Sequence, residues 1–432
     1  MSGDAAIRWD VFEEHLEEAA FLHQLWEEAL RSPLYALHEI AAGPEERMLA
    51  HVDGLVVAGR KVAERLLLPA LSSDEAGVAF AAALALALAE DGDFLEPILE
   101  ALGKAEPGPR AALRRALSIA PVPGLGPRLA ALAPRSAPAL QVDLLEVLAT
   151  LRVDPGIRLE PLAASREPGA EARALRIARA FPQRLDAQVI ARALSSPDGE
   201  TRAAAIETAS ITGARGARAA AEESVAARGP AFPRAALVLA LAGDEKAVGA
   251  LAPALGDEKV RSAAAFALGF TGRVSAADAL LDAVKVEALA PVAAEGFAAI
   301  AGVAVEKRFA RVPPRWRPLP PGAKEDEEEE RYGPEADLPE PVPETLARWW
   351  AEARPGLDPA VRWLRGRPYG VAALARELEE GPARRREGLA LDVAIRTRGG
   401  VLLAWDALAA RQRKELSAVE GIPSPAAPPP HR

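Results

Sequence analysis

The stretch LGDEKVRSAAAFALGFTGRVSAADALLDAV (residues 255–284) holds two short runs of small and apolar residues that are separated by Gly272. The first run follows Arg261 and the second follows a tight turn. Alanine-rich runs favour helix, and a Gly after the last helical turn is typical of a left-handed C-cap. The stretch therefore predicts a pair of helices joined by a short turn.

The same pattern recurs through the middle of the chain. TRAAAIETASITG (201–213) and PRAALVLALAG (233–243) match it, and Gly213, Gly243, Gly272 and Gly302 are spaced by 30, 29 and 30 residues. The register predicts first helices near 74–90, 108–119, 137–150, 168–180, 201–212, 233–242, 260–271 and 288–301, with second helices such as 185–194, 247–255 and 276–284. Such pairs bury their apolar faces only by stacking, so we predict an all-α fold, an α-solenoid of about eight helical pairs.

The composition agrees with this fold class and restricts the function. Aromatic residues make up 5% of the chain, and there is no Cys, which excludes disulfides and thiolate metal sites. The longest apolar run, Val78–Ala89, is too short to span a bilayer, and the first residues do not resemble a secretion signal. We therefore expect a cytoplasmic protein without a membrane span. The net charge of −10 disfavours general nucleic-acid binding.

The pattern divides the chain into five parts. Residues 1–71 depart from the repeat and predict a helical hairpin, of helices 9–31 and 45–68, that caps the solenoid at 72–309. Gly59 lies within the apolar stripe of the second helix, where another helix could approach closely. A Pro-rich and acidic linker or loop follows at 310–343, then a C-terminal helical segment at 344–420 that includes 358–370, then a disordered tail at 421–432.

Three groups of residues are candidates for specific roles. Arg173, Arg202, Arg234 and Arg261, with Asp198 and Asp257, recur with the repeat and predict a structural ladder, with an anion-binding stripe as the alternative. Interleaved Trp and Arg at Trp349, Trp350, Arg362, Trp363 and Arg365 are candidates for partner binding, although Trp in a small domain is more often core. Arg384, Arg385 and Arg386 are interpreted as a solvated helix face.

The N-terminal histidines are the third group. Four of the five His residues lie between residues 15 and 51. A helical wheel places His15 and His23 on the apolar side of the first helix and His51 at the margin of the second helix's stripe. No HExxH or ExxH motif is present, so hydrogen-bonded side chains at the hairpin seam are favoured over metal ligands, with a pH-dependent contact as the alternative.

Two resemblances add to these predictions. Residues 255–284, with Asp257 before the helix and Arg261 in its first turn, resemble the short bacterial HEAT repeat, also called the phycobilisome-lyase-like HEAT repeat. The ends HLEEAAFLHQLWEEAL (15–30), HVDGLVVAG (51–59) and the Arg-rich stretch at 362–395 resemble an uncharacterised proteobacterial HEAT-repeat family. Its members are often encoded near type VI secretion components, which implies an accessory or adaptor role.

These observations predict a non-enzymatic scaffold or adaptor that binds protein partners on stacked repeats. The alternative is an enzyme or cofactor-handling subunit similar to bilin-lyase-type HEAT-repeat proteins. No catalytic, cofactor-binding or metal-binding residue is assigned, because no nucleophile with a positioned base and no phosphate-binding Gly loop is visible.

Overall fold

A computed structural model describes residues 8–89, 92–311 and 335–421. Their contacts divide the chain into two compact units. Unit 1 contains residues 1–31, 35–162 and 404–413, and unit 2 contains 32–34, 163–403 and 414–432. These limits do not coincide with the predicted domain boundaries, because a piece from near the C-terminus belongs to the N-terminal unit.

Unit 1 begins with two antiparallel helices, α1 (Trp9–Ala29) and α3 (Glu46–Val57), which pack on each other. Between them lie α2 (Leu37–Ile40) and the π-helical turn η1 (Ala41–Glu45). The second predicted helix does not run on to residue 68. Gly59 has a φ of 75° and breaks it, and α4 (Arg60–Val62), η2 (Ala63–Leu67) and α5 (Leu68–Ala70) follow. The prediction that Gly59 lies inside a helix was therefore wrong.

The first repeats complete unit 1. They comprise α6 (Ala76–Leu88), α7 (Leu95–Lys104), α8 (Pro107–Ile119), α9 (Leu125–Leu132), η3 (Ala133–Arg135) and α10 (Pro138–Leu151). Helix α6 is buried at every position from Ala79 to Leu86, because α1, α3 and α8 all pack against its small side chains. Among the described residues, no helix combines the length and the apolarity needed to cross a bilayer.

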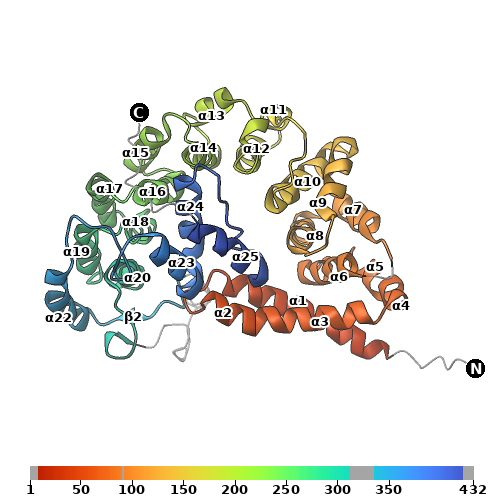
Figure 1. The fold of residues 1–432 in the computed structure, drawn as a ribbon, viewed down its shortest axis with the longest axis horizontal. Helices are drawn as coiled ribbons and strands as arrows, with labels where there is room; N and C mark the ends of the chain where they lie inside the picture. Colours follow the sequence, from red (N-terminus) through yellow and green to blue (C-terminus); the bar gives the residue numbers. More distant parts are fainter. Residues whose placement is uncertain (1–7, 90–91, 312–334, 422–432) are drawn as a thin grey trace, which may run out of the picture. The chain divides into compact units, whose positions relative to one another are not determined.

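Unit 2 carries the other repeats as two rows of helices (Figure 1). The first row contains α12 (Ala170–Ala178), α14 (Gly199–Thr212), α16 (Phe232–Leu241), α18 (Arg261–Leu268) and α20 (Ala290–Ala301). The second row contains α13 (Ala187–Ala193), α15 (Ala217–Ala227), α17 (Glu245–Leu251) and α19 (Val274–Ala283). The short elements α11 (Glu160–Ala163), η4 (Pro182–Arg184), η5 (Ala252–Gly256) and η6 (Glu287–Leu289) connect them. Each first-row helix packs on the next one, which confirms the predicted all-α solenoid of stacked helical pairs.

The chain then returns along unit 2, apart from residues 404–413, which belong to unit 1. After η7 (Lys307–Phe309), strand β1 (Ala310–Arg311) pairs antiparallel with β2 (Glu340–Pro341), and the predicted acidic run at 325–330 lies outside the described residues. Next come α22 (Pro343–Ala353), η10 (Arg354–Gly356), β3 (Trp363–Leu364), β4 (Arg367–Pro368), α23 (Val371–Glu380), η11 (Ala383–Arg385), α24 (Arg386–Arg396) and α25 (Ala409–Glu420). The predicted tail lies almost wholly outside the described residues.

One part of this segment corrects the sequence prediction. Residues 363–368 form an antiparallel β-hairpin, with Trp363 opposite Pro368, where a helical segment was predicted. Arg365 and Gly366, with φ of 46° and 71°, form its turn. Two consecutive residues with positive φ are typical of a type I′ hairpin turn, whose twist matches that of the strands.

Candidate interaction site

The β3–β4 hairpin binds the ends of first-row helices through its own backbone. Trp363 N donates to the carbonyl oxygen of Gly272 at 2.7 Å. Arg365 N and Gly366 N donate to the carbonyl oxygens of Ala299 and Ile300 at 2.8 and 2.9 Å. The last carbonyls of a helix have no partner within the helix. The hairpin therefore satisfies two of the last carbonyls of α20 and one carbonyl in the turn that follows α18.

The repeat glycines make this contact possible. Gly213, Gly243, Gly272 and Gly302 all have positive φ, between 66° and 85°, as C-cap residues do. A Cβ atom at Gly243 would lie 2.7 Å from Cδ of Arg362, and one at Gly302 would lie 2.6 Å from the carbonyl oxygen of Arg365. Gly213 and Gly302 are the C-caps of α14 and α20, Gly243 follows the C-cap of α16, and Gly272 lies four residues beyond the end of α18. Glycine at Gly243, Gly272 and Gly302 also leaves room for the C-terminal segment.

A charged cluster holds the same segment in place. The guanidinium of Arg362 lies 3.9 Å from the ring centre of Tyr369 and donates to the carbonyl oxygen of Phe270 at 2.8 Å. Tyr369 donates its hydroxyl to Asp392 at 2.7 Å, and Arg396 donates to the same carboxylate at 2.8 Å. Burial, and then the charge of Asp392, raise the pKa of Tyr369. Tyr369 therefore stays protonated and serves as a donor within the cluster.

The predicted partner-binding residues make mainly intramolecular contacts. Trp350 is buried and donates from Nε1 to Asp278 at 2.8 Å, and its ring meets the edge of Phe297. Trp349 packs on Trp350 and Phe309. The others, Arg362, Trp363 and Arg365, are half-buried in the hairpin contact. The core role that was the alternative for these tryptophans holds for Trp350. Partner binding at the five residues stays a prediction.

The Arg384–Arg386 run also differs from its prediction. Arg385 and Arg386 are each only 2% exposed, so a solvated face was wrong for both. The guanidinium of Arg385 lies 3.9 Å from the ring centre of Phe270, and burial lowers its pKa to about 10. Arg386 donates from Nε to the carbonyl oxygen of Leu378 at 2.8 Å. Aromatic rings and carbonyls distant in sequence replace the water that was expected around these cations.

A chain of ion pairs crosses the first row of helices. Glu207 on α14 is buried and pairs with Arg179 at the end of α12 and with Arg234 on α16, the second at 3.1 Å. Arg234 also pairs with Glu387 on α24 at 2.7 Å. Because the partners lie on successive repeats, these ion pairs connect one repeat to the next.

The other residues of the predicted ladder make separate contacts. Arg202 pairs with Glu223 at 2.9 Å, and Arg261 pairs with Glu258 at 3.7 Å. The two Asp side chains have different roles. Asp198 is the N-cap of α14 and accepts from Thr201 N at 2.8 Å, whereas Asp257 forms an ion pair with Arg228 at 2.8 Å. Arg173 lies half-buried on α12. These contacts are separate from the ion pairs of Glu207, and the structural ladder stays a prediction.

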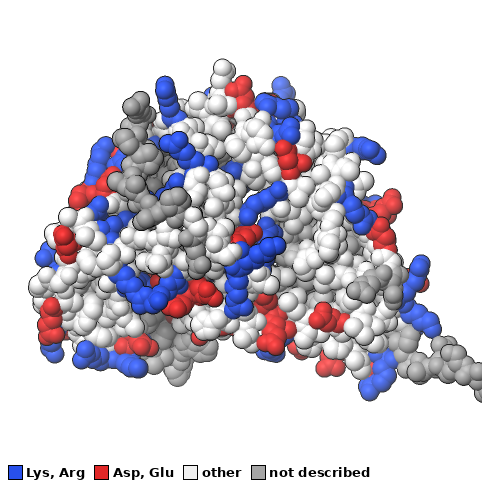
Figure 2. Space-filling model, viewed as in Figure 1, with Lys and Arg blue, Asp and Glu red and all other residues white. Residues whose placement is uncertain are grey.

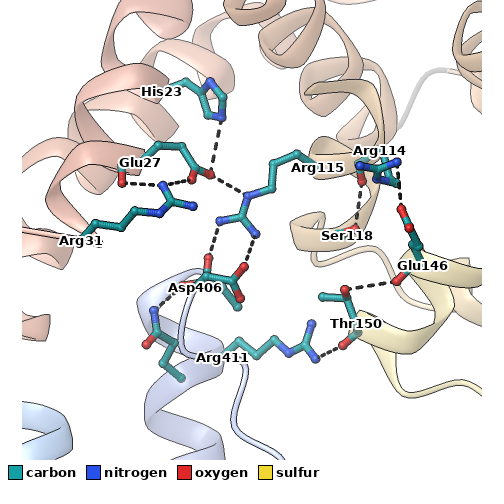
Figure 3. A network of polar contacts seen from close by, with 12 residues as sticks. His23, Glu27, Arg31, Arg114, Arg115, Ser118, Glu146, Thr150, Asp406 and Arg411 are labelled. Atoms are coloured by element: carbon teal, nitrogen blue, oxygen red, sulfur yellow. Dashed lines mark hydrogen bonds and ion pairs between the residues drawn. The ribbon is translucent and has the colours of Figure 1, made fainter. Parts of the chain in front are cut away.

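In unit 1, Arg115 on α8 connects two segments that are far apart in sequence (Figure 3). It donates to Glu27 on α1 at 2.6 Å and to the side chain of Asp406 at 3.2 Å. Arg411, from the same C-terminal piece, donates to the carbonyl oxygen of Thr150 at 2.5 Å. These contacts attach residues 404–413 to the first repeats.

The structure brings two of the three candidate histidines together. His15 on α1 and His51 on α3 place their Nδ1 atoms 3.0 Å apart. His23 lies elsewhere on α1, stacked on Phe80 with ring centres 3.5 Å apart, and its Nε2 is 3.8 Å from Glu27. One seam therefore contains His15 and His51, and His23 belongs to the contact between α1 and α6.

Burial of His23 predicts a pH dependence of stability. Burial lowers the pKa of His23 from 6.5 to about 4. Between these values the unfolded chain binds a proton that the folded chain does not, so stability is lost as the pH falls from 6.5 towards 4. The loss should reach on the order of 3 kcal/mol. Urea unfolding at several pH values should show this decline in the wild type and a weaker one in His23→Gln, and equal declines would contradict the prediction.

The outward face of α1 carries an exposed apolar side chain among acidic ones. Phe21 is 55% exposed. Glu14, Glu17, Gln24 and Glu28, at helical spacings of three and four on either side of it, are also exposed. We refer to these five residues as the α1 stripe. Glu17 forms no ion pair with any residue that the structure describes. The sequence analysis did not identify Phe21, although its position four residues after Glu17 places it on the same face of the helix.

Comparisons with known proteins show a likeness of fold only. No protein-family model matches the chain, and no curated protein matches it. Among solved structures, it is similar to YibA of Escherichia coli, with 12% identity over 69% of this chain and 98% of that one, at a TM-score of 0.29. It is also similar to human deoxyhypusine hydroxylase in complex with glycerol, with 19% identity over 66% and 97%, at a TM-score of 0.21. Scores this low support no inference about activity.

The surface charge is mixed in sign. Figure 2 shows Lys and Arg side chains interspersed with Asp and Glu over the face drawn, with uncharged surface between them. In the described part of the chain, charged side chains are paired along or between helices, as Arg218 is with Asp244 at 2.8 Å and Lys104 with Glu100 at 2.6 Å. The α1 stripe differs, because it combines acidic side chains with an exposed aromatic ring.

Proposed function

We propose that this protein is a non-enzymatic scaffold or adaptor that binds a protein partner through the α1 stripe. The exposure of Phe21 carries the proposal, because aromatic rings are enriched at the centres of protein interfaces and Phe21 has polar neighbours on both sides. The stacked helical pairs support it, because such repeats hold a long helix face rigidly.

The helix ends of unit 2 are already covered, which favours α1 as the binding surface. Residues 363–366 bind the end of α20 and the turn after α18. Arg362 donates to Phe270 in that turn, Arg396 donates to Leu241 at the end of α16, and Arg398 lies beside Gly213 at the end of α14. That row of helix ends already binds a polypeptide segment, which is the chain's own. A partner therefore binds more readily where an apolar side chain is exposed.

We further propose that the partner belongs to a type VI secretion system. The support is the resemblance of residues 15–30, 51–59 and 362–395 to a family encoded near such components. Residues 15–30 include the α1 stripe from Glu17 onwards, so the resembling segment and the proposed surface overlap.

Affinity purification with paired variants tests this proposal. Phe21→Ala removes the exposed ring, while Val57→Ala removes an 85% exposed side chain from α3, the neighbouring helix. Neither change should alter stability by more than about 0.5 kcal/mol, because both side chains are on the surface. We expect mass spectrometry to find a partner with the wild type and Val57→Ala that Phe21→Ala loses.

Two outcomes would count against the proposal. If all three proteins retain the same partners, the α1 stripe is not the binding surface. If a partner is found but it is no secretion component, the scaffold role stands and the type VI assignment fails.

A further inference from the structure

His15 and His51 bring two ring nitrogens to one point from two helices. Their Nδ1 atoms are 3.0 Å apart, and the ring centres are 5.0 Å apart with the ring planes inclined at 64°. Both side chains are half-buried, so solvent reaches the pair. The two residues are 36 positions apart in sequence, and only the packing of α1 on α3 brings them together.

The surrounding packing holds the two rings in place. Leu16 and Val52, which follow the two histidines in sequence, and Ala19 and Leu55, one helical turn further on, are all buried. Gly54 lies under the His15 ring, where a Cβ atom would be 3.2 Å from Cε1 and Nε2. A seam with this packing presents its imidazoles with little freedom to move apart, which lowers the entropy lost when both bind one ligand.

The distance between the nitrogens suits a shared metal ion. Metal–nitrogen bonds of about 2.0–2.1 Å place two imidazole nitrogens roughly 2.9 Å apart at a right angle and roughly 3.4 Å apart at a tetrahedral angle. The observed 3.0 Å lies between these values. Imidazole is a preferred ligand of Zn²⁺ and Cu²⁺, and Cu²⁺ binds most tightly of the common divalent ions.

We propose that His15 and His51 form a two-imidazole site for a divalent transition-metal ion of the Cu²⁺ and Zn²⁺ class. Each ring binds through Nδ1 and carries its proton on Nε2. In the absence of metal one ring donates from Nδ1 to the other, so on binding that ring moves its proton to Nε2 and the neutral pair releases none. Among the described residues, no group of three or more His, Asp or Glu side chains is placed so that it could hold a metal ion. Water therefore supplies the ligands other than the two imidazoles.

Titration of the untagged full chain with Cu²⁺ tests the site. Calorimetry should show one strong equivalent, and electron paramagnetic resonance should show coupling to two nitrogens. His15→Gln and His51→Gln should each lose that equivalent. His38→Gln, which removes an exposed histidine from α2, should keep it and serves as the matched control.

Melting curves separate loss of the site from loss of the fold. Without metal, the wild type and both seam variants should show one cooperative transition, and Cu²⁺ should raise the melting temperature of the wild type alone. Cu²⁺ binding that persists in His15→Gln and His51→Gln, or a wild type without the strong equivalent, would overturn the proposal. So would loss of binding in His38→Gln.

Discussion

Replacing Gly272 by Ala is expected to destabilise the protein by about 2–5 kcal/mol. Gly272 has a φ of 68°, which costs a residue with a Cβ atom about 1–2 kcal/mol. The new Cβ atom would also lie 2.7 Å from Cγ of Arg362 and against the backbone of Trp363, so the C-terminal hairpin must shift or leave. Crowding of this kind costs a further 1–3 kcal/mol or so.

Gly213→Ala is the matched control for this change. Gly213 ends α14 with a φ of 72°, so the backbone term is the same. The nearest atom to its Cβ would be Cδ of Arg398 at 3.7 Å, which is an ordinary contact. We expect Gly213→Ala to lose only about 1–2 kcal/mol. The difference between the two variants measures the docking of the hairpin.

Urea unfolding and hydrogen exchange together check this prediction. The amides of Trp363, Arg365 and Gly366 donate to helix-end carbonyls, so they should be protected from exchange in the wild type and in Gly213→Ala. In Gly272→Ala their protection should fall more than that of the first-row helices. Equal stability and equal protection in the two variants would show that the hairpin does not depend on the repeat glycine.

Replacing Glu45 by Ala is expected to cost about 3 kcal/mol or more, because it leaves buried donors without an acceptor. Glu45 is 5% exposed at the end of the π-helical turn η1. Its carboxylate accepts from Nε1 of the fully buried Trp26 at 3.0 Å and from the backbone N of Ala409 at 2.9 Å. Bonds to a charged acceptor contribute about 1.5–3 kcal/mol each.

Glu45→Gln keeps a hydrogen-bond acceptor but removes the negative charge, so it separates the two contributions to stability. It retains one side-chain oxygen of similar position, so we expect it to lose less than half as much stability as Glu45→Ala. Urea unfolding followed by tryptophan fluorescence would measure both values. If the two variants are equally stable, the hydrogen bonds from Trp26 and Ala409 contribute little, and the attachment of residues 404–413 depends on Arg115 and Arg411 instead.

The repeat architecture could be predicted because it is a property of local sequence. The spacing of Gly213, Gly243, Gly272 and Gly302, with alanine-rich runs between them, indicates helices of one length that end in the same way. A short amphipathic pair must stack to bury its apolar side, so the periodicity alone predicts a solenoid. The same local pattern predicted a first helix at 9–31, and the observed helix α1 ends two residues earlier, at Ala29.

The interpretation of Arg385 and Arg386 as a solvated face failed because distant segments cover these residues. Arg385 is buried because Phe270 and Glu295 approach it from other elements, and nothing in the run Arg384–Arg386 indicates those neighbours. Trp350 is buried against Phe297 and bonded to Asp278 for the same reason. Residues 363–368 were predicted to be helical, but Arg365 and Gly366 both have positive φ and form the turn of a hairpin that packs on the repeats.

The sequence by itself determined the fold class, the register of the helical pairs and the places of Gly213 and Gly302 as C-caps. These depend on hydrophobic periodicity and on backbone preferences, which act over a few residues. Only the tertiary structure decided that the glycines receive the C-terminal hairpin and that His15 meets His51 and not His23. It also decided that Phe21 is exposed while Trp350 packs inward. Such outcomes depend on which surfaces remain to be covered once all the elements have packed, and this is a property of the whole fold.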